Sequence, residues 1–386
     1  MQPQAVPVEE LGITSDEAVW LGKPASRALE AEAHRAGLQL GQSGDIITLS
    51  AGAVATAEAL AGFRRATDAV DGDAVGMLAG AIGEWGDWRA FGPQPKLIRL
   101  RGGGELTAQR LGAATEVEVP IAEPREVTFP LADRPGGREV TLVLANEVLC
   151  STHHYSGLLW ANLLALTPAL WRTLLGTNVA VALLRSVWAW LRVRSTDPFV
   201  LAGALNHIEK GARIHPSAVV EASWIGEGAR IGAGAVVRGC ILGAGASVEP
   251  MALAQFSVMG PSSHLQRMGW MHFSLLHEGA AHAGAMQLGV LGPGASSKGV
   301  SVLMDQGVGT EIRVQRDGVL HPVPLGLMGV GVGRDSMIGS GVLVAPGRTV
   351  PPGVSILPPA GHVLMSIPQG IEGTARVTDG GLERIS

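Results

Sequence analysis

The segment SWIGEGARIGAGAVVRG, residues 223–239, places an aliphatic side chain at every sixth position: Ile225, Ile231 and Val237. We call these positions slots. A set of three slots returns every 17 residues between 208 and 288, and a further run in steps of six extends from 332 to 356. The other slots are Ile208, Ile214, Val220, Leu242, Val248, Ala254, Met259, Leu265, Met271, Leu276, His282, Leu288, Val332, Ile338, Val344, Val350 and Ile356. Self-similarity at this period predicts a solenoid, in which stacked coils bury a core that no single coil could bury alone.

The residues between the slots suit tight corners between short strands. A small side chain stands four residues after most slots, as at Ala229 and Ala235, and glycine directly follows several slots, as at Gly226 and Gly232. We therefore predict three short strands per coil, with coils about 4.8 Å apart and the slots pointing into the axis.

Two motifs, SWIGEGARIGAGAVVRG and VGRDSMIGSGVLVAPGRTVPPGVSI (332–356), resemble the left-handed β-helix family of hexapeptide-repeat transferases, and the resemblance covers residues 201–361. It implies a left-handed parallel β-helix and a homotrimer, since the flat faces of this family pack around a threefold axis. Residues 289–331 break the period and predict a hairpin excursion with a tight turn at Asp317-Gly318. Residues 362–386 are predicted to form a C-terminal tail.

Composition narrows the class of partner. A net charge of −5, without any lysine- or arginine-rich run, argues against nucleic acid as a partner. Two cysteines among 386 residues do not form a disulfide framework, and the polar start MQPQAVPVEELG (1–12) is unlike a signal peptide. We predict a cytoplasmic protein that acts on a small-molecule substrate.

Residues 1–150 alternate helical and strand-like patterns, which predicts an α/β domain. The predicted helices cover 24–37 and 55–66, and the predicted strands cover 46–50, 97–101, 116–120, 126–130 and 139–145. We interpret the glycine run 102–104 as a tight hairpin turn between two of these strands.

The segment LGKPASRALEAEAHRAGLQL (21–40) resembles the Lys-Pro segment of sugar-phosphate nucleotidyltransferases, where a lysine contacts the sugar phosphate. The resemblance implies that Lys23 binds substrate. That family opens with a G-x-G-T-R loop that cradles the nucleotide phosphates, and nothing before Lys23 supplies it. We therefore interpret residues 1–150 as a degenerate nucleotidyltransferase-like domain that binds a ligand or serves as a platform.

Residues 151–200 are predicted to be an apolar helical connector with helices near 156–174 and 178–193. The stretch 151–195 holds four of the nine tryptophans and no acidic residue. Two interpretations stay open: a connector packed between domains or subunits, and peripheral membrane contact through 156–194, where arginines stand beside tryptophan and leucine.

Chemistry is predicted in HLQRMGWMHFSLLHEGAAH, residues 264–282. In the hexapeptide acyltransferases that the chain resembles, a histidine between subunits takes a proton from the acceptor as the acceptor attacks an acyl thioester. The resemblance implies His277 or His272 as this base, with Glu278 to orient His277. The donor is then an acyl-CoA or an acyl carrier thioester, and the acceptor a sugar, a nucleotide-sugar or a similar small molecule.

His282 occupies a slot that should face the core. It is therefore either a neutral histidine bonded to backbone or a residue that faces a groove. We include it, together with His264, as a candidate for substrate contact.

Two further functions stay open. His272 and His277 have the H-x4-H spacing of hexapeptide-type γ-carbonic anhydrases, but Arg238 and Gln255 stand where the third zinc ligand would be expected, so we assign no metal ligand. The alternative from another class is a non-enzymatic trimeric scaffold or regulatory subunit whose N-terminal domain binds a ligand.

Overall fold

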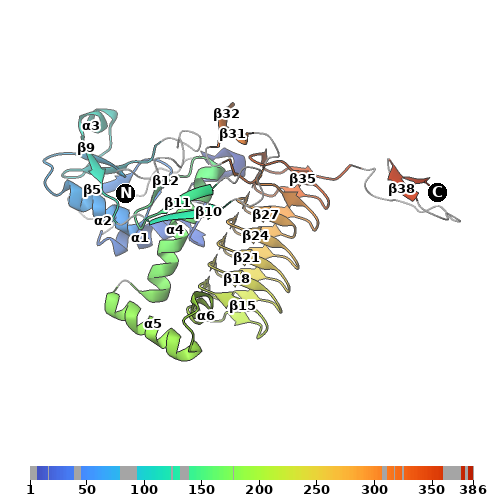
Figure 1. Ribbon diagram of the computed structural model, residues 1–386. Helices are drawn as coiled ribbons and strands as arrows, with labels where there is room; N and C mark the ends of the chain where they lie inside the picture. The colour runs from blue at the N-terminus through green and yellow to red at the C-terminus, as the bar shows by residue number, and fades with distance from the viewer. Residues whose placement is uncertain are drawn as a thin grey trace.

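The C-terminal half of the chain forms a left-handed parallel β-helix of about eight coils (Figure 1). The computed structural model describes residues 7–15, 17–38, 45–78, 94–122, 125–130, 139–176, 178–306, 311–316, 318–323, 326–359, 375–378 and 381–385. Three parallel sheets make the three faces of the β-helix, and each strand pairs with the strand of the next coil.

The strands divide among the faces as follows. The first face contains β13 (His207–Ile208), β16 (Trp224–Ile225), β19 (Ile241–Leu242), β22 (Val258–Met259), β25 (Leu275–Leu276), β28 (Val290–Leu291), β33 (Gly331–Val332) and β36 (Thr349–Val350). The second face contains β14 (Arg213–Ile214), β17 (Arg230–Ile231), β20 (Ser247–Val248), β23 (His264–Leu265), β26 (Ala281–His282), β29 (Ser296–Ser297), β34 (Met337–Ile338) and β37 (Ser355–Ile356). The third face contains β15 (Val219–Glu221), β18 (Val236–Arg238), β21 (Leu253–Gln255), β24 (Trp270–His272), β27 (Ala285–Gln287), β30 (Val302–Leu303) and β35 (Leu343–Val344).

The predicted interior of the β-helix is confirmed. Ile225, Leu242, Met259 and Leu276 pair in one continuous register on the first face, and none of them is more than 1% exposed. Each buried aliphatic side chain therefore covers the one in the next coil, and the stack forms a single core.

The period changes where one coil is shortened. Leu276 pairs with Leu291, 15 residues on, and Met271 pairs with Met286, so Met286 takes the third interior slot that the sequence assigned to Leu288. The strands β28, β29 and β30 then form a further coil within the segment predicted to leave the β-helix. The excursion itself carries the antiparallel hairpin β31 (Arg313–Arg316) and β32 (Val319–Pro322); its predicted turn residue Asp317 lies outside the described residues.

The N-terminal region is α/β, as predicted. Its elements are β1 (Pro7–Val8), η1 (Glu9–Leu11), β2 (Ile13–Thr14), β3 (Val19–Trp20), β4 (Lys23–Pro24), α1 (Ala25–Arg35), β5 (Ile46–Leu49), β6 (Ala53–Ala55), α2 (Ala57–Thr67), β7 (Ala74–Leu78), β8 (Leu97–Leu100), α3 (Ala108–Ala113), β9 (Thr115–Val119), β10 (Arg125–Pro130), β11 (Glu139–Leu144) and β12 (Leu149–Ser151). A mixed sheet in the order β5-β8-β7-β9 holds the centre, with α2 packed on it.

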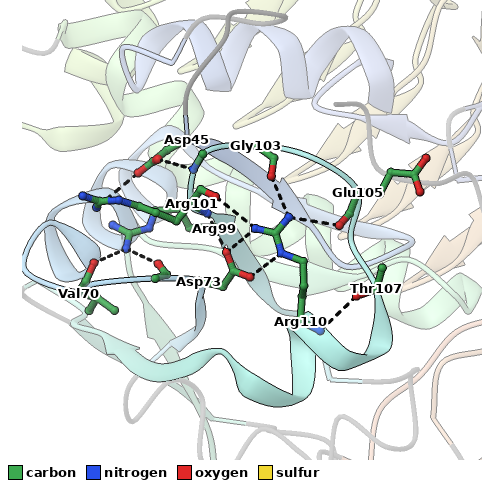
Figure 2. Close-up of polar contacts among 11 residues, drawn as sticks. Asp45, Val70, Asp73, Arg99, Arg101, Gly103, Glu105, Thr107 and Arg110 are labelled. Carbon is green, nitrogen blue, oxygen red and sulfur yellow. Dashed lines mark hydrogen bonds and ion pairs between the residues drawn. The ribbon is translucent and has the colours of Figure 1, made fainter.

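The glycine run after β8 is not the hairpin turn that the sequence predicted. β9 pairs in parallel with β7 and does not pair with β8, and α3 lies between β8 and β9. Figure 2 shows Arg110 of α3 holding this loop: its guanidinium donates to Asp73 at 2.7 Å and to the carbonyl of Gly103 at 2.8 Å. The glycines have positive φ, which lets the chain turn towards α3.

Helix α4 (Tyr155–Leu175) joins the two halves (Figure 1). It packs against the outward side of the first face, and the hydroxyl of Tyr155 donates to the carbonyl of Gly329 at 3.1 Å. By length and composition α4 could cross a membrane, but 72% of its most apolar window is buried inside the protein, so we interpret it as a core helix. Pro168 lies within it.

Two shorter helices follow, α5 (Val179–Val193) and α6 (Pro198–Ala204), before the β-helix begins. At the other end of the chain, β38 (Ala375–Thr378) and β39 (Gly381–Arg384) pair as an antiparallel hairpin. The rest of the predicted tail lies outside the described residues.

Candidate functional site

The candidate histidines lie on different faces of the β-helix. His272 ends β24 on the third face, His277 follows β25 on the first face, and His282 points into the interior from β26 on the second face. They follow one another at intervals of five residues in the sequence, but each interval crosses a corner between two faces of the β-helix. They do not form one cluster.

His277 is completely buried. Its Nδ1 donates to the carbonyl of Leu291 at 3.0 Å, and its Nε2 has no hydrogen-bond partner in the described part of the chain. Burial lowers its pKa to about 4. The sequence predicts an outward side chain. The N-terminal segment of the same chain lies against an earlier coil at Gly260 and a later coil at Arg334, and His277 between them is completely buried, so its imidazole has no surface on which to meet an acceptor.

Glycines make this cover possible. The positions that match His277 in two earlier coils are Gly243 and Gly260, and a Cβ there would lie 2.7 Å from the carbonyl oxygen of Gly22 and 2.9 Å from Val19. The N-terminal segment can approach the β-helix backbone because these side chains are missing. Arg334 lies just after β33 in a later coil. It donates to the carbonyl of Gly12 and to the carboxylate of Glu17, and so holds the same N-terminal segment.

His282 is a satisfied interior histidine. Its Nε2 donates to the carbonyl of Trp270 at 3.1 Å, and its Nδ1 accepts from the hydroxyl of Ser297 at 2.6 Å. Burial lowers its pKa to about 4, which keeps the ring neutral at pH 7. Of the two alternatives that the sequence left open, the structure has the bonded core histidine.

His272 differs because it is half-buried on the outward side of the third face. Its ring stacks on Phe273 at a centroid distance of 4.1 Å, and Trp270 and Phe256 lie within 6.2 Å. Burial lowers its pKa, and a hydrogen bond with the side chain of Gln287, one coil on, opposes that shift. The imidazole is therefore neutral near pH 7 and can accept a proton.

The other two candidates are exposed and apart from His272. Glu278 lies after the buried His277, and no hydrogen bond or ion pair between these two side chains is found. His264 lies on the second face, where its Nδ1 is 2.6 Å from the hydroxyl of Ser247. Neither residue contacts His272.

Within the described ranges, no group of three or more His, Cys, Asp and Glu side chains could hold a metal ion. The zinc-dependent alternative needs three converging ligands, and the candidate histidines point from three faces. Cys150 and Cys240 are buried and free, and burial raises the pKa of each thiol to about 12.

A second candidate site lies between α1, α4 and the first face. A cavity of about 250 Å³ is bounded by these elements. Its polar and aromatic lining residues are Lys23, Glu32, Arg35, Arg172, Thr173 and Trp224. The Lys23 predicted from sequence thus lies in a real cavity.

The charge of this cavity is positive. Glu32 is buried, accepts from Arg35 and from Arg172, and also accepts from the backbone N–H of Ala57, where α2 begins. Lys23 is exposed, its Nζ lies 4.9 Å from the centre of the Trp224 ring, and no carboxylate pairs with it in the described chain. Arg172 also pairs with Glu58, which lies outside the cavity lining, so Lys23 is the cation that these carboxylates leave unpaired. The lining itself has three cations and one carboxylate, and this favours an anionic ligand.

Of the six cavity residues named above, sequence reasoning found Lys23 and missed the other five: Glu32, Arg35, Arg172, Thr173 and Trp224. Arg172 offered a signal, since it is the one charged residue in α4 and cations inside an apolar helix usually have a partner. Glu32 offered another, because it follows Ala25 and Ala28 along the buried side of α1. Trp224 carried no such signal.

No protein-family model matches this sequence, and no curated protein matches it. A solved structure from Bacillus cereus, described as a putative acetyltransferase, is similar at 13% identity over 38% of this chain and 78% of that one. The TM-score of this match is 0.19. The fold, a left-handed parallel β-helix preceded by an α/β region, is therefore assigned from the structure of this chain itself.

Proposed function

We propose that the protein is a group transferase of the hexapeptide-repeat type, which moves an acyl group from an acyl-CoA or acyl carrier thioester onto a small acceptor. The β-helix and the repeat motifs support the class. The observation that carries the reaction is the position of His272, a neutral and accessible imidazole on the outward side of the third face.

His272 can act as the general base of such a transfer. It accepts the proton of the acceptor hydroxyl or amine while that oxygen or nitrogen bonds to the thioester carbonyl carbon. The carbon–sulfur bond then breaks, and the thiolate leaves and takes up the proton. We assign the base to His272 and not to His277, because complete burial keeps His277 away from an acceptor.

The third face also supports a homotrimer. Its outward side chains form an apolar file beside a polar file of Glu221, Arg238, Gln255, His272 and Gln287. The apolar file is Val219, Val236, Leu253, Trp270, Ala285, Val302 and Leu343, and each of its members is partly or fully exposed. Packing of this file against a neighbouring subunit would place His272 at the edge of the contact, where an acceptor can enter.

The cavity around Lys23 supports a second candidate function. A scaffold or regulatory protein that senses a small anion needs a basic, partly enclosed site, and Lys23, Arg35 and Arg172 provide one. A phosphate-bearing sugar or nucleotide suits the cavity, since its charge would meet these cations and a flat ring could stack on Trp224. A cytoplasmic location is part of both proposals.

Thermal stabilisation of the full chain by coenzyme A tests the first proposal. We expect binding by the wild type and by His272→Ala, because the base touches the acceptor proton and not the pantetheine arm. Acyl transfer should fall roughly 10²–10⁴-fold in His272→Ala. His215→Ala, which removes an exposed histidine of the second face, is the matched control. Equal activity in His272→Ala and His215→Ala would remove His272 from the site.

A further inference from the structure

Helix α5 exposes an unusual amount of apolar surface. Figure 1 shows it at the end of the molecule away from the β31–β32 hairpin, beside α6. Val179 is 86% exposed, Leu184 68% and Trp188 53%, and Ala189 is the one buried residue of the helix. The exposed large apolar residues of α5 are Val179, Val181, Leu183, Leu184, Val187, Trp188, Trp190 and Leu191.

Polar contacts help to hold this helix against its neighbours α4 and α6. The side chain of Asn178 accepts from the backbone N–H of Ala180 at 2.8 Å and caps the start of the helix. Arg185 donates to the carbonyls of Thr173 and Leu174, both at 3.0 Å, and so ties α5 to the end of α4. The eight exposed apolar side chains of α5 are thus free to contact another surface. Full burial of one such side chain is worth about 1.5–3 kcal/mol.

The charges in and around α5 indicate which kind of partner surface its apolar side chains would contact. Between Glu147 and Asp197 the sequence contains no acidic residue, whereas Arg185, Arg192 and Arg194 lie in or directly after α5. The guanidinium of Arg192 lies 5.3 Å from the centre of the Trp188 ring. Tryptophan, leucine and arginine without carboxylates are the composition of helices that lie in a lipid–water interface.

We propose that α5 binds the surface of a membrane that contains anionic lipid, with its apolar side chains among the acyl chains and its arginines at the headgroups. A second copy of α5 is a poorer occupant, because two copies would bring arginines together without any carboxylate to offset them. Lipid phosphates supply the missing negative charge. Helix α4 stays inside the protein, so the chain rests on the membrane.

Sedimentation of the full chain with phosphatidylcholine vesicles, with and without phosphatidylglycerol, tests this. We expect binding to the anionic vesicles that weakens as salt is added. The double variant Leu184→Ser/Trp188→Ser should lower the partition coefficient by about 100-fold. The double variant Arg192→Gln/Arg194→Gln should lower it roughly tenfold or more, on anionic vesicles alone.

The control is Met268→Ser/Val300→Ser, which removes two apolar side chains at a corner of the β-helix that are more exposed than Leu184 and Trp188. It should bind as the wild type does, and all variants should keep the wild-type circular dichroism spectrum, because the residues are exposed. Equal binding to neutral and anionic vesicles would overturn the proposal. So would an absence of vesicle binding together with an oligomer that Leu184→Ser/Trp188→Ser dissociates, which would assign α5 to a second copy of the chain.

Discussion

The Nδ1 atom of His282 lies 2.6 Å from the hydroxyl oxygen of Ser297, one coil further along the interior of the β-helix. Both residues occupy positions that are aliphatic in the flanking coils, where Leu265 and Ile338 stand. The pair is therefore a polar contact inside an otherwise apolar stack, and each partner satisfies the other.

Replacement of one partner should cost more than replacement of both. We expect His282→Leu to lower the free energy of unfolding by about 1–3 kcal/mol, since the Ser297 hydroxyl and the Trp270 carbonyl lose their partner. Adding Ser297→Ala should restore about 1 kcal/mol or more. Urea unfolding of the two single variants and the double variant measures this coupling. Additive effects of the two substitutions on the unfolding free energy would show that His282 and Ser297 are not coupled.

Stability should fall on mild acidification. His277 and His282 have folded-state pKa values of about 4, below the 6.5 of an unfolded histidine. Between these values the unfolded chain binds more protons, so the stabilising contribution is complete above pH 6.5 and is lost towards pH 4. The loss is about 3 kcal/mol per histidine between pH 7 and pH 4.

Chemical denaturation at several pH values measures that slope. The two histidines together make the unfolding free energy depend on pH. In the double variant His282→Leu/Ser297→Ala this contribution should be about half as large, because only His277 remains. A wild-type unfolding free energy that does not change between pH 7 and pH 5 would contradict the burial of both rings.

The contact between α4 and the first face depends on a missing side chain. A Cβ at Gly331 would lie 2.8 Å from the ring of Tyr155. Gly331→Ala should therefore destabilise the protein by about 1–3 kcal/mol, since the ring must move. Tyr155→Phe should cost about 1 kcal/mol through the lost bond to Gly329. Gly299→Ala is the control, because a Cβ there would have open space around it. Gly341→Ala would not serve, because the φ of Gly341 is positive. Equal thermal shifts for Gly331→Ala and Gly299→Ala would argue against this packing.

The cavity should discriminate by charge. Binding of a nucleoside-diphosphate sugar, measured by calorimetry, should weaken about tenfold in Lys23→Ala, because one charge-assisted contact is lost. Lys210→Ala removes an exposed lysine outside the cavity and should bind as the wild type does. Equal affinities in the two variants, or a preference for an uncharged sugar, would contradict an anion site.

The β-helix could be predicted because its constraint is local. The side chain in every slot, such as Ile225 or Leu242, must fit the same narrow core of the β-helix, so the period of the coils appears in the sequence itself. The shortened coil was mispredicted for the same reason: Leu288 continues the spacing, and only pairing with the next coil shows that Met286 is inside.

The candidate site was harder to predict because it depends on distant segments. His277 and His272 look alike in sequence, since each follows a slot, but His277 is completely buried beside the N-terminal segment, whereas His272 stays half-exposed. Similarly, Lys23 and Trp224 meet across about half of the chain. No local pattern records either contact.

Acceptor-dependent release of free thiol from an acyl-CoA, measured with a panel of small hydroxyl and amine acceptors, tests the central proposal most directly. We predict release by the wild type and by His215→Ala, and a fall of roughly 10²–10⁴-fold in His272→Ala. Thiol release at the wild-type rate in His272→Ala, or no acceptor-dependent release by the wild type, would contradict acyl transfer at His272.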